Sequence, residues 1–151
     1  RLREVSGKKV YGYLPSRVKR IVDEIVDELA KDDAFFIDGG GVTFSGGEPL
    51  AQAEFLNNCL LALDGKVHRA IQTTGFCQTD TFLKILSNCD FVLYDLKHMD
   101  SEIHKKYTGV GNEKILENYK LLASSKKEFI TRVPLIELPQ IVRTVQKTPL
   151  W

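Results

Sequence analysis

The chain has 151 residues, of which 43% are apolar, so it is long enough for one sizeable hydrophobic core and too short for two domains. Its 21 Lys and Arg nearly balance its 20 Asp and Glu, and a net charge of +1 gives no general attraction to nucleic acid or anionic membranes. No apolar run approaches the roughly 20 residues of a membrane span, and no signal peptide is apparent. We therefore expect a single domain over residues 1–151 of a soluble, cytoplasmic protein, with no nucleic acid and no membrane partner.

Hydrophobic periodicity predicts alternating strands and helices. Apolar residues recur at helical spacing over 18–29, after a candidate cap at Ser16. Beyond residue 40, the predicted strands are 42–45, 69–73, 91–96 and 129–135, and the predicted helices are 49–63, 80–86 and 113–123. Regular alternation with short connections favours an α/β fold with about four parallel strands joined by right-handed crossovers.

Cysteine and histidine residues do not form a metal-binding pattern. Cys59, Cys77 and Cys89 are odd in number and widely spaced, which fits neither a disulfide framework nor a zinc site. We expect these thiols to be reduced and mostly buried. His104 lies in segment 101–109, which is expected to be a loop, where it could be a ligand or a base but is more often a hydrogen-bonding brace.

The most informative segment is 38–49, which places two adjacent glycines directly after a short strand and before a helix. Gly46 and Gly47 leave main-chain N–H and C=O groups open to a ligand, while Glu48 adds an acceptor. Pro49 presets the first helical turn. The acceptor-rich side of such a turn suits an ammonium group. A plain strand-to-helix turn, in which Glu48 only complements the helix dipole, stays open as an alternative.

Polar residues also occupy the carboxyl ends of the other predicted strands, where ligands gather in parallel α/β folds. They are Thr73, Asp95, Lys97 and Arg132. Asp95 and Lys97 are two residues apart on a strand and point the same way, so a plain salt bridge is an alternative. Thr73 could equally satisfy backbone groups, and Arg132 could pair with a neighbouring carboxylate. Together, four strands bring both charge signs to one rim, which favours a binding site.

Several motifs in order resemble those of glycyl radical enzyme activating enzymes of the pyruvate formate-lyase activating type, which belong to the radical S-adenosylmethionine superfamily. The likeness covers roughly residues 1–136, and the motifs lie in 39–52, 72–75, 94–100, 104–112 and 131–136. The turn 46–49 alone would indicate only the wider superfamily. The resemblance implies a partial (β/α) TIM-like barrel, of which about four parallel strands are present here.

The resemblance also implies a function. The intact protein would hold a 4Fe–4S cluster and S-adenosylmethionine, and would cleave the latter reductively to a 5′-deoxyadenosyl radical. This radical would remove hydrogen from a glycine Cα of the partner, a glycyl radical enzyme similar to pyruvate formate-lyase. Reduced flavodoxin or ferredoxin would donate the electron, in anaerobic or facultative metabolism.

The resemblance assigns seven residues to the S-adenosylmethionine site, namely Gly46, Gly47, Glu48, Thr73, Asp95, Lys97 and Arg132. The glycines and Glu48 would hold the methionine ammonium, and Thr73 with Asp95 would flank a candidate small-cation site. Lys97 and Arg132 would face the carboxylate and other polar groups of the cofactor. No residue of this chain is expected to act as an acid or base.

Two departures from the family pattern affect these expectations. Gln72 stands where the family usually has Asp or Glu, which removes a charge from the candidate cation site. The Cys-x3-Cys-x2-Cys run that binds the cluster in the family does not occur, so no cluster is expected in this chain. We interpret the chain as an inactive fragment that lacks the cluster segment, with strand 42–45 at an exposed sheet edge. Residues 137–151 depart from the family pattern.

Three other functions stay open from the sequence. One is a different radical S-adenosylmethionine enzyme that acts on a small molecule. Another is a non-catalytic domain that binds S-adenosylmethionine. The third is a sugar-phosphate barrel enzyme, which would bind phosphate at the same rim, where Glu48 would repel it.

Overall fold

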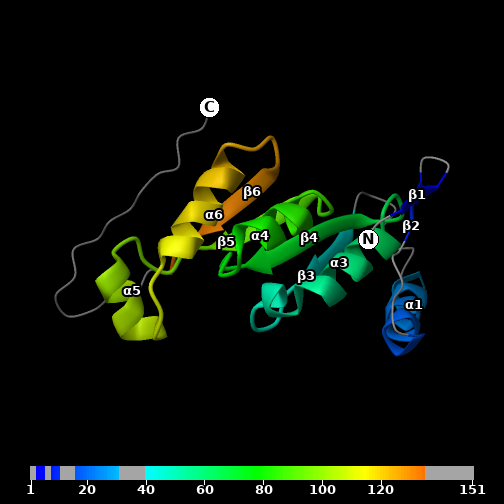
Figure 1. The fold of residues 1–151 in the computed structure, drawn as a ribbon, viewed down its shortest axis with the longest axis horizontal. Helices are drawn as coiled ribbons and strands as arrows, with labels where there is room; N and C mark the ends of the chain where they lie inside the picture. The colour runs from blue at the N-terminus through cyan, green and yellow to red at the C-terminus, as the bar shows by residue number, and fades with distance from the viewer. Residues whose placement is uncertain (1–2, 6–7, 11–15, 31–39, 135–151) are drawn as a thin grey trace.

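The computed structural model describes residues 3–5, 8–10, 16–30 and 40–134. Four parallel strands form one sheet in the order β3-β4-β5-β6, which is also their order along the chain (Figure 1). They are β3 (Gly41–Phe44), β4 (His68–Thr73), β5 (Phe91–Asp95) and β6 (Glu128–Arg132). The predicted α/β fold with four parallel strands is confirmed, and β3 lies at an edge of the sheet within the described residues.

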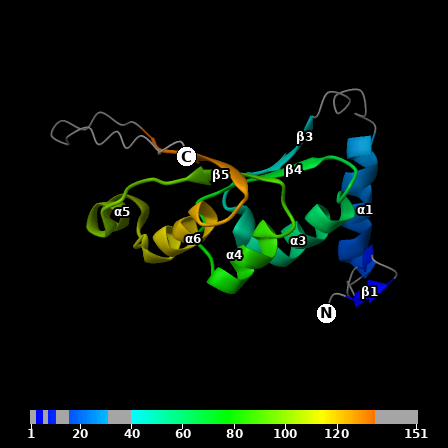
Figure 2. The same cartoon turned by 90° about the horizontal axis from the view of Figure 1, so that it is seen from above.

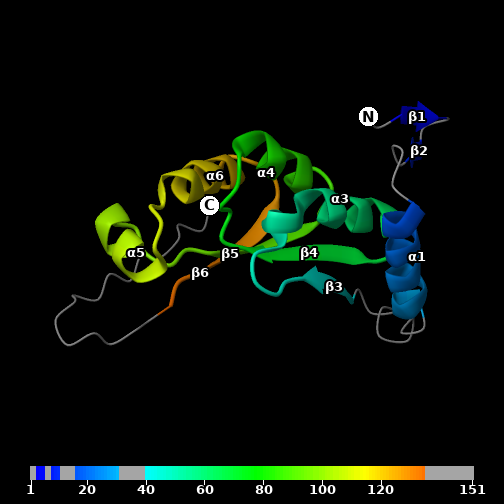
Figure 3. The ribbon, with the colours of Figure 1, turned by 60° about the horizontal axis from the view of Figure 1, so that its bottom comes forward.

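Helices occupy one face of this sheet. The connecting elements are the 3-10 turn η1 (Pro49–Gln52), α3 (Ala53–Ala62), α4 (Thr79–Leu86), α5 (Ser101–Thr108) and α6 (Glu113–Ala123). Figures 2 and 3 show α3, α4 and α6 on the same side of the strands, whereas α5 lies beyond the end of β5. Within the described residues no element covers the opposite face, which we call the bare face.

Two further elements precede the sheet. Helix α1 (Ser16–Ala30) confirms the predicted helix and packs against α3. A short antiparallel hairpin of β1 (Arg3–Val5) and β2 (Lys8–Val10) was not predicted, because three-residue strands are too short to display an alternating pattern. No helix in the described ranges is long and apolar enough to cross a membrane.

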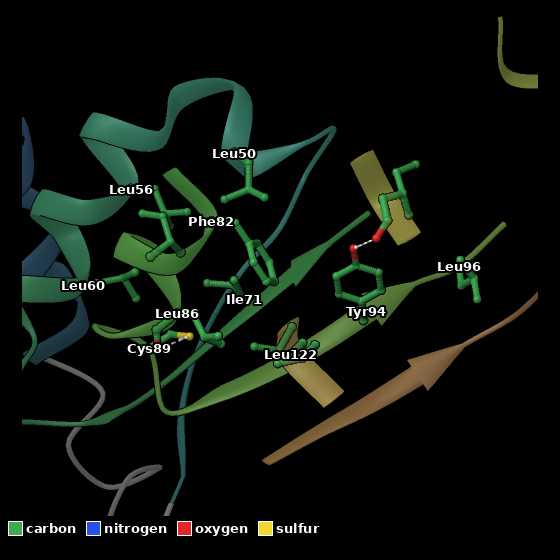
Figure 4. Close-up of a cluster of buried hydrophobic side chains, with 13 residues drawn as sticks. Leu50, Leu56, Leu60, Ile71, Phe82, Leu86, Cys89, Tyr94, Leu96 and Leu122 are labelled. Carbon is green, nitrogen blue, oxygen red and sulfur yellow. Dashed lines mark hydrogen bonds between the residues drawn. The ribbon is translucent and has the colours of Figure 1, made fainter. Parts of the chain in front are cut away.

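The hydrophobic core lies between the sheet and its helices (Figure 4). Ile71, Val92 and Tyr94 of the central strands are fully buried, as is Phe82 of α4. The rings of Tyr94 and Phe82 meet edge to face with centroids 6.1 Å apart, and the Tyr94 hydroxyl donates to the Ile115 carbonyl at 2.6 Å. Each large apolar side chain buried in this way contributes about 1.5–3 kcal/mol, so these contacts hold the helices on the sheet.

The expectation of a loop over 101–109 is wrong, because this segment forms helix α5. Asp100 caps the helix by accepting a hydrogen bond from Ile103 N at 2.9 Å, and Gly109 ends it with a left-handed φ of +84°. Its hydrophobic periodicity is weak, since His104 is the one buried residue in the helix. The local signal for this helix lies in its capping residues, Asp100 and Gly109, and not in apolar periodicity.

The predicted boundaries of the other elements are close to the observed ones. The predicted strands begin at residues 42, 69, 91 and 129. Each of these positions is within one residue of the first residue of the observed strand, β3, β4, β5 or β6 respectively. The fourth strand was expected to reach residue 135, but β6 ends at Arg132, and residues 135–151 lie outside the described residues. The predicted helix 49–63 is divided into η1 and α3.

A buried arginine closes the end of the sheet at which the strands begin. The Arg69 guanidinium donates to both carboxylate oxygens of Asp90 at 2.9 and 2.8 Å and to the Leu60 carbonyl at 2.9 Å. It also lies 2.7 Å from the carboxylate of Asp64. These contacts connect β4 with α3 and with the segment that enters β5. The hydrogen bond from Arg69 is the main cause that lowers the pKa of Asp90.

The lowered pKa of Asp90 predicts a specific pH dependence of stability. The ionised pair stabilises the folded state above the ordinary Asp pKa of about 3.9, and this stabilisation is lost as pH falls through the lower folded-state value. We expect Asp90→Asn to be less stable than the unsubstituted protein at pH 7 and to lose less stability between pH 5 and acid, as measured by urea unfolding. Asp64→Asn is the control, because Asp64 is largely exposed. Equal pH slopes for the unsubstituted and Asp90→Asn proteins would contradict the prediction.

Candidate functional site

The parallel sheet brings the carboxyl ends of all four strands to one rim. All seven residues assigned by resemblance lie at this rim, where the structure places five of them in two groups. Glu48, after β3, contacts Thr73 at the end of β4, whereas Asp95 contacts both Lys97 and Arg132. The strand register explains the second group, because it pairs Asp95 of β5 with Arg132 of β6.

The glycine turn after β3 has an open main chain. Gly46 and Gly47 have φ values of +83° and +56°, a left-handed conformation that strongly favours glycine. Both residues are exposed, and a Cβ built on either would meet no atom within 4 Å. Within residues 40–134, neither glycine takes part in a turn hydrogen bond. The N–H and C=O groups of this turn are therefore available to a ligand.

The carboxylate of Glu48 joins this turn to the end of β4. Oε1 accepts hydrogen bonds from Leu50 N at 3.0 Å and from the Thr73 hydroxyl at 2.5 Å. Oε2 accepts from the main-chain N–H of Thr74 at 2.8 Å and from its hydroxyl at 2.6 Å. We call this arrangement the Glu48 tie. In the plain-turn alternative Glu48 only complements the helix dipole. The structure shows that Glu48 caps η1 through the bond from Leu50 N and that it also accepts three bonds from Thr73 and Thr74.

Three charged side chains form the second group. Arg132 Nε donates to Asp95 Oδ1 at 2.7 Å, and Lys97 Nζ donates to Asp95 Oδ2 at 3.4 Å. Burial raises the pKa of Asp95, but the hydrogen bond from Arg132 and the two positive charges outweigh it, so the pKa lies below its usual range. The side chain of Asp95 is 13% exposed, against 44% for Lys97 and 42% for Arg132. The salt bridges considered from the sequence are thus present, and one positive charge in excess faces solvent.

The two groups lie on opposite sides of the sheet plane. Thr73 follows Ile71 by two residues and shares its helix-covered face, so it is buried. Asp95 and Arg132 follow Leu93 and Ile130 by two residues and lie on the bare face. A ligand that extends from the glycine turn to Arg132 would therefore cross the strand ends on the bare side.

His104 is a structural brace. It is buried, and its Nδ1 lies 2.8 Å from the Val110 carbonyl and 3.0 Å from the Thr108 hydroxyl. In the same region Asn112 donates to the carbonyls of His98 and Met99 at 2.8 and 2.9 Å. The brace interpretation from the sequence is confirmed.

Sequence reasoning did not single out two residues that support the rim. Thr74 supplies two of the four hydrogen bonds to Glu48. Asn118 of α6 donates to the carbonyls of Gly75 and Cys77 at 2.8 and 3.0 Å, and so holds the loop that follows β4. Two adjacent hydroxyl residues at a strand end were a readable signal for Thr74. The partners of Asn118 are 41 and 43 residues away, so no local pattern indicates them.

The three cysteines do not form a cluster site. All three are free thiols, with Cys59 and Cys89 buried and Cys77 half-buried, as expected. Burial is the main cause that raises the pKa of each to about 11, so the thiols stay protonated at neutral pH. In the described ranges, no group of three or more His, Cys, Asp or Glu side chains could hold a metal ion. These residues therefore do not fit an iron–sulfur cluster.

Comparison with known proteins identifies the family. The family model described as "Radical SAM superfamily" matches residues 8–137, which is most of the chain. The chain belongs to this superfamily.

Its relatives include several activating enzymes. The chain is 47% identical over 118 residues to a 4-hydroxyphenylacetate decarboxylase activating enzyme from Clostridioides difficile, covering 76% of this chain and 37% of the relative. It is 39% identical to a (2S)-3-sulfopropanediol dehydratase activating enzyme from Klebsiella oxytoca, covering 76% of this chain and 37% of the relative. It is also 39% identical to an isethionate sulfite-lyase activating enzyme from Desulfovibrio desulfuricans, covering 86% and 41%. The chain thus spans about two fifths of the length of these relatives.

A solved structure supports the fold. The crystal structure of a domain of pyruvate-formate lyase-activating enzyme from Bacteroides vulgatus superposes with a TM-score of 0.57 at 42% identity, covering 64% of this chain and 61% of that chain. The resemblance to activating enzymes and the partial radical S-adenosylmethionine fold are confirmed.

Two of the three thiols are buried, and in the described ranges they do not gather into a ligand group, which predicts that this chain does not assemble a cluster. We expect anaerobic incubation of the 151-residue protein with iron and sulfide to give no 4Fe–4S absorption or paramagnetic signal. We also expect Cys59 and Cys89 to react slowly with iodoacetamide at pH 7.5, and faster in urea. A stoichiometric cluster bound to the folded chain would contradict this prediction.

The left-handed φ of Gly47 predicts a backbone cost for any side chain. We expect Gly47→Ala to destabilise the protein by about 1–2 kcal/mol in urea unfolding, because the conformation rather than a collision is unfavourable. Gly47→Asn is the matched comparison, since Asn tolerates this conformation better and should cost less. An unchanged stability for Gly47→Ala would show that the turn adopts another conformation.

Proposed function

We propose that this chain is the S-adenosylmethionine-binding part of an activating enzyme that installs a radical on a glycyl radical enzyme. The proposal rests on one observation: in a radical SAM fold, the open glycine turn and the charged group formed by Asp95, Lys97 and Arg132 lie at the same rim of the sheet. S-adenosylmethionine would supply, on reductive cleavage, the 5′-deoxyadenosyl radical that takes hydrogen from a glycine Cα of the partner.

The described residues fit S-adenosylmethionine. The open main chain at Gly46 and Gly47 offers carbonyl acceptors for the methionine ammonium. Arg132 and Lys97 carry one positive charge in excess over Asp95 and would meet the methionine carboxylate. Asp95 would keep both cations at the end of the sheet. Thr73 is hydrogen-bonded to Glu48, and Asp95 is paired with Lys97 and Arg132. A small cation between Thr73 and Asp95 would have to compete with these bonds.

The cluster belongs, in this proposal, to a part of the protein outside this chain. The chain spans about two fifths of its curated relatives, and its own thiols are dispersed and buried. The chain alone would accordingly be inactive. Reduced flavodoxin or ferredoxin would deliver the electron in the cytoplasm of an anaerobic or facultative cell.

The partner is proposed only as a glycyl radical enzyme, with pyruvate formate-lyase as one candidate. Identity to the pyruvate-formate lyase-activating domain is 42%, while identity to the decarboxylase activating enzyme is 47%. These values support the general function and do not favour pyruvate formate-lyase over the decarboxylase.

The full-length protein that contains this chain tests the proposal. After anaerobic reconstitution with iron and sulfide, we expect it to convert S-adenosylmethionine to 5′-deoxyadenosine in the presence of dithionite. Electron paramagnetic resonance should then detect a glycyl radical in the correct partner. A protein with a fully loaded cluster that forms no 5′-deoxyadenosine would favour a non-catalytic binding domain instead.

The charged group predicts the effect of one substitution. We expect Arg132→Gln to weaken S-adenosylmethionine binding by about fivefold, because an exposed cation facing the cofactor carboxylate is lost. Arg20→Gln is the matched control, since Arg20 is an exposed arginine paired with Glu24 at 3.6 Å on α1, at the opposite end of the sheet from α5 (Figure 3). Equal affinities of the two variants for S-adenosylmethionine would show that Arg132 is not part of the binding site.

A further inference from the structure

We infer that this chain binds S-adenosylmethionine without a small cation, because Arg132 and Lys97 supply from within the chain the positive charge that such an ion would bring. The inference rests on the proposed function, since it concerns the charges around the methionine carboxylate of the same cofactor. It takes the place of the candidate small-cation site at Thr73 and Asp95 that the resemblance implied. It also gives a physical consequence to Gln72, at which the chain departs from the family pattern.

The side chain of Thr73 is not available to an ion that Asp95 binds. The Thr73 hydroxyl donates to Glu48 at 2.5 Å and accepts from the main-chain N–H of Gly75 at 2.9 Å. Thr73 is 2% exposed and lies on the helix-covered face of the sheet, whereas Asp95 lies on the bare face. The two side chains therefore do not converge on one ion.

The carboxylate of Asp95 is occupied by two cations of the chain itself. Oδ1 accepts from Arg132 Nε at 2.7 Å, and Oδ2 accepts from Lys97 Nζ at 3.4 Å. Strand pairing places Arg132 directly opposite Asp95, and Lys97 follows Asp95 by two residues. Because both cations are held beside the carboxylate by the fold, their effective concentration there is high. A monovalent ion from solution would have to displace one of them.

The charges around the methionine carboxylate balance without an added ion. Asp95 carries one negative charge, while Lys97 and Arg132 carry one positive charge each, so the carboxylate of the cofactor makes the group neutral. Gln72 lies on the same bare face, one strand away, and adds no charge. An Asp or Glu at position 72 would leave one negative charge in excess, which a monovalent cation would neutralise. The neutral side chain at 72 removes the charge for which an ion would be needed.

Binding measurements in different salts test the inference without turnover. The full-length protein carries its reconstituted cluster, receives no reductant and is dialysed into N-methylglucamine chloride, whose cation is too large for a small-cation site. Isothermal titration calorimetry then gives its affinity for S-adenosylmethionine in this salt and in potassium or sodium chloride at equal ionic strength. We expect the three affinities to agree within about twofold. Tight binding only in potassium or sodium chloride would overturn the inference and would still support the proposed function.

A direct probe of ion binding deals with a trace ion that survives dialysis. Thallium(I) resembles potassium in charge and size, and its magnetic resonance line broadens when a protein binds it. We expect the complex of the unsubstituted protein with S-adenosylmethionine to cause no broadening that added potassium chloride reverses. Broadening that potassium reverses would reveal an occupied site and would overturn the inference.

Two substitutions should create the cation dependence that the unsubstituted chain lacks. Gln72→Glu adds a negative charge on the bare face, and Arg132→Gln removes a positive one, so each leaves an uncompensated negative charge beside the bound carboxylate. We expect each variant to bind S-adenosylmethionine about fivefold more tightly in potassium chloride than in N-methylglucamine chloride. Gln78→Glu is the matched control, because Gln78 is exposed and makes the same charge change at the start of α4. Its affinity should not depend on the cation.

The remaining outcomes keep the two proposals apart. Salt-independent binding by both Gln72→Glu and Arg132→Gln would overturn the inference, because the uncompensated charge would then attract no ion. Failure of the unsubstituted, cluster-loaded protein to bind S-adenosylmethionine in any of the salts would overturn the proposed function, and the inference with it.

Discussion

The hydrogen bonds that Glu48 accepts from the end of β4 are the contact on which the rim depends. Parallel strands align their carboxyl ends, but the sheet does not determine the path of the chain beyond them. Here one carboxylate, bound by Thr73, Thr74 and Leu50, connects the turn after β3 both to the neighbouring strand and to the start of η1. The exposed glycines are held at a defined place because the residue that follows them is held.

The two ends of the sheet each carry an arginine, but one arginine is buried and the other is exposed, which indicates different roles for the two ends. Arg69 is buried at the end where the strands begin, and its donors are satisfied by Asp90, Asp64 and a carbonyl. At the opposite end, Arg132 is exposed, and its Nε donates to one carboxylate oxygen of Asp95. A satisfied buried arginine stabilises the fold, whereas an exposed cation at the same rim as an open turn can meet an anionic group of a ligand.

Much of the fold could be predicted because its signals are local. Short apolar segments that alternate with helical segments along the chain predicted all four strands of the sheet. The helical spacing of apolar residues in 18–29 predicted α1. Helix α5 was missed because its ends are defined by Asp100 and Gly109 rather than by an apolar stripe. The candidate residues were likewise found at strand ends, but Asn118 was not, since its partners lie across the fold.

The sequence by itself determined the alternation of elements, the open conformation available to Gly46 and Gly47, the absence of the cysteine run, and the family motifs. These features depend on residue type and on spacing over a few positions. Only the tertiary structure decided that Glu48 binds Thr73 and Thr74 and that Arg132 binds Asp95. These partners are 25 to 37 residues apart, and the register and order of parallel strands bring them together. Hydrogen bonds require separations of about 3 Å, which a linear pattern does not specify.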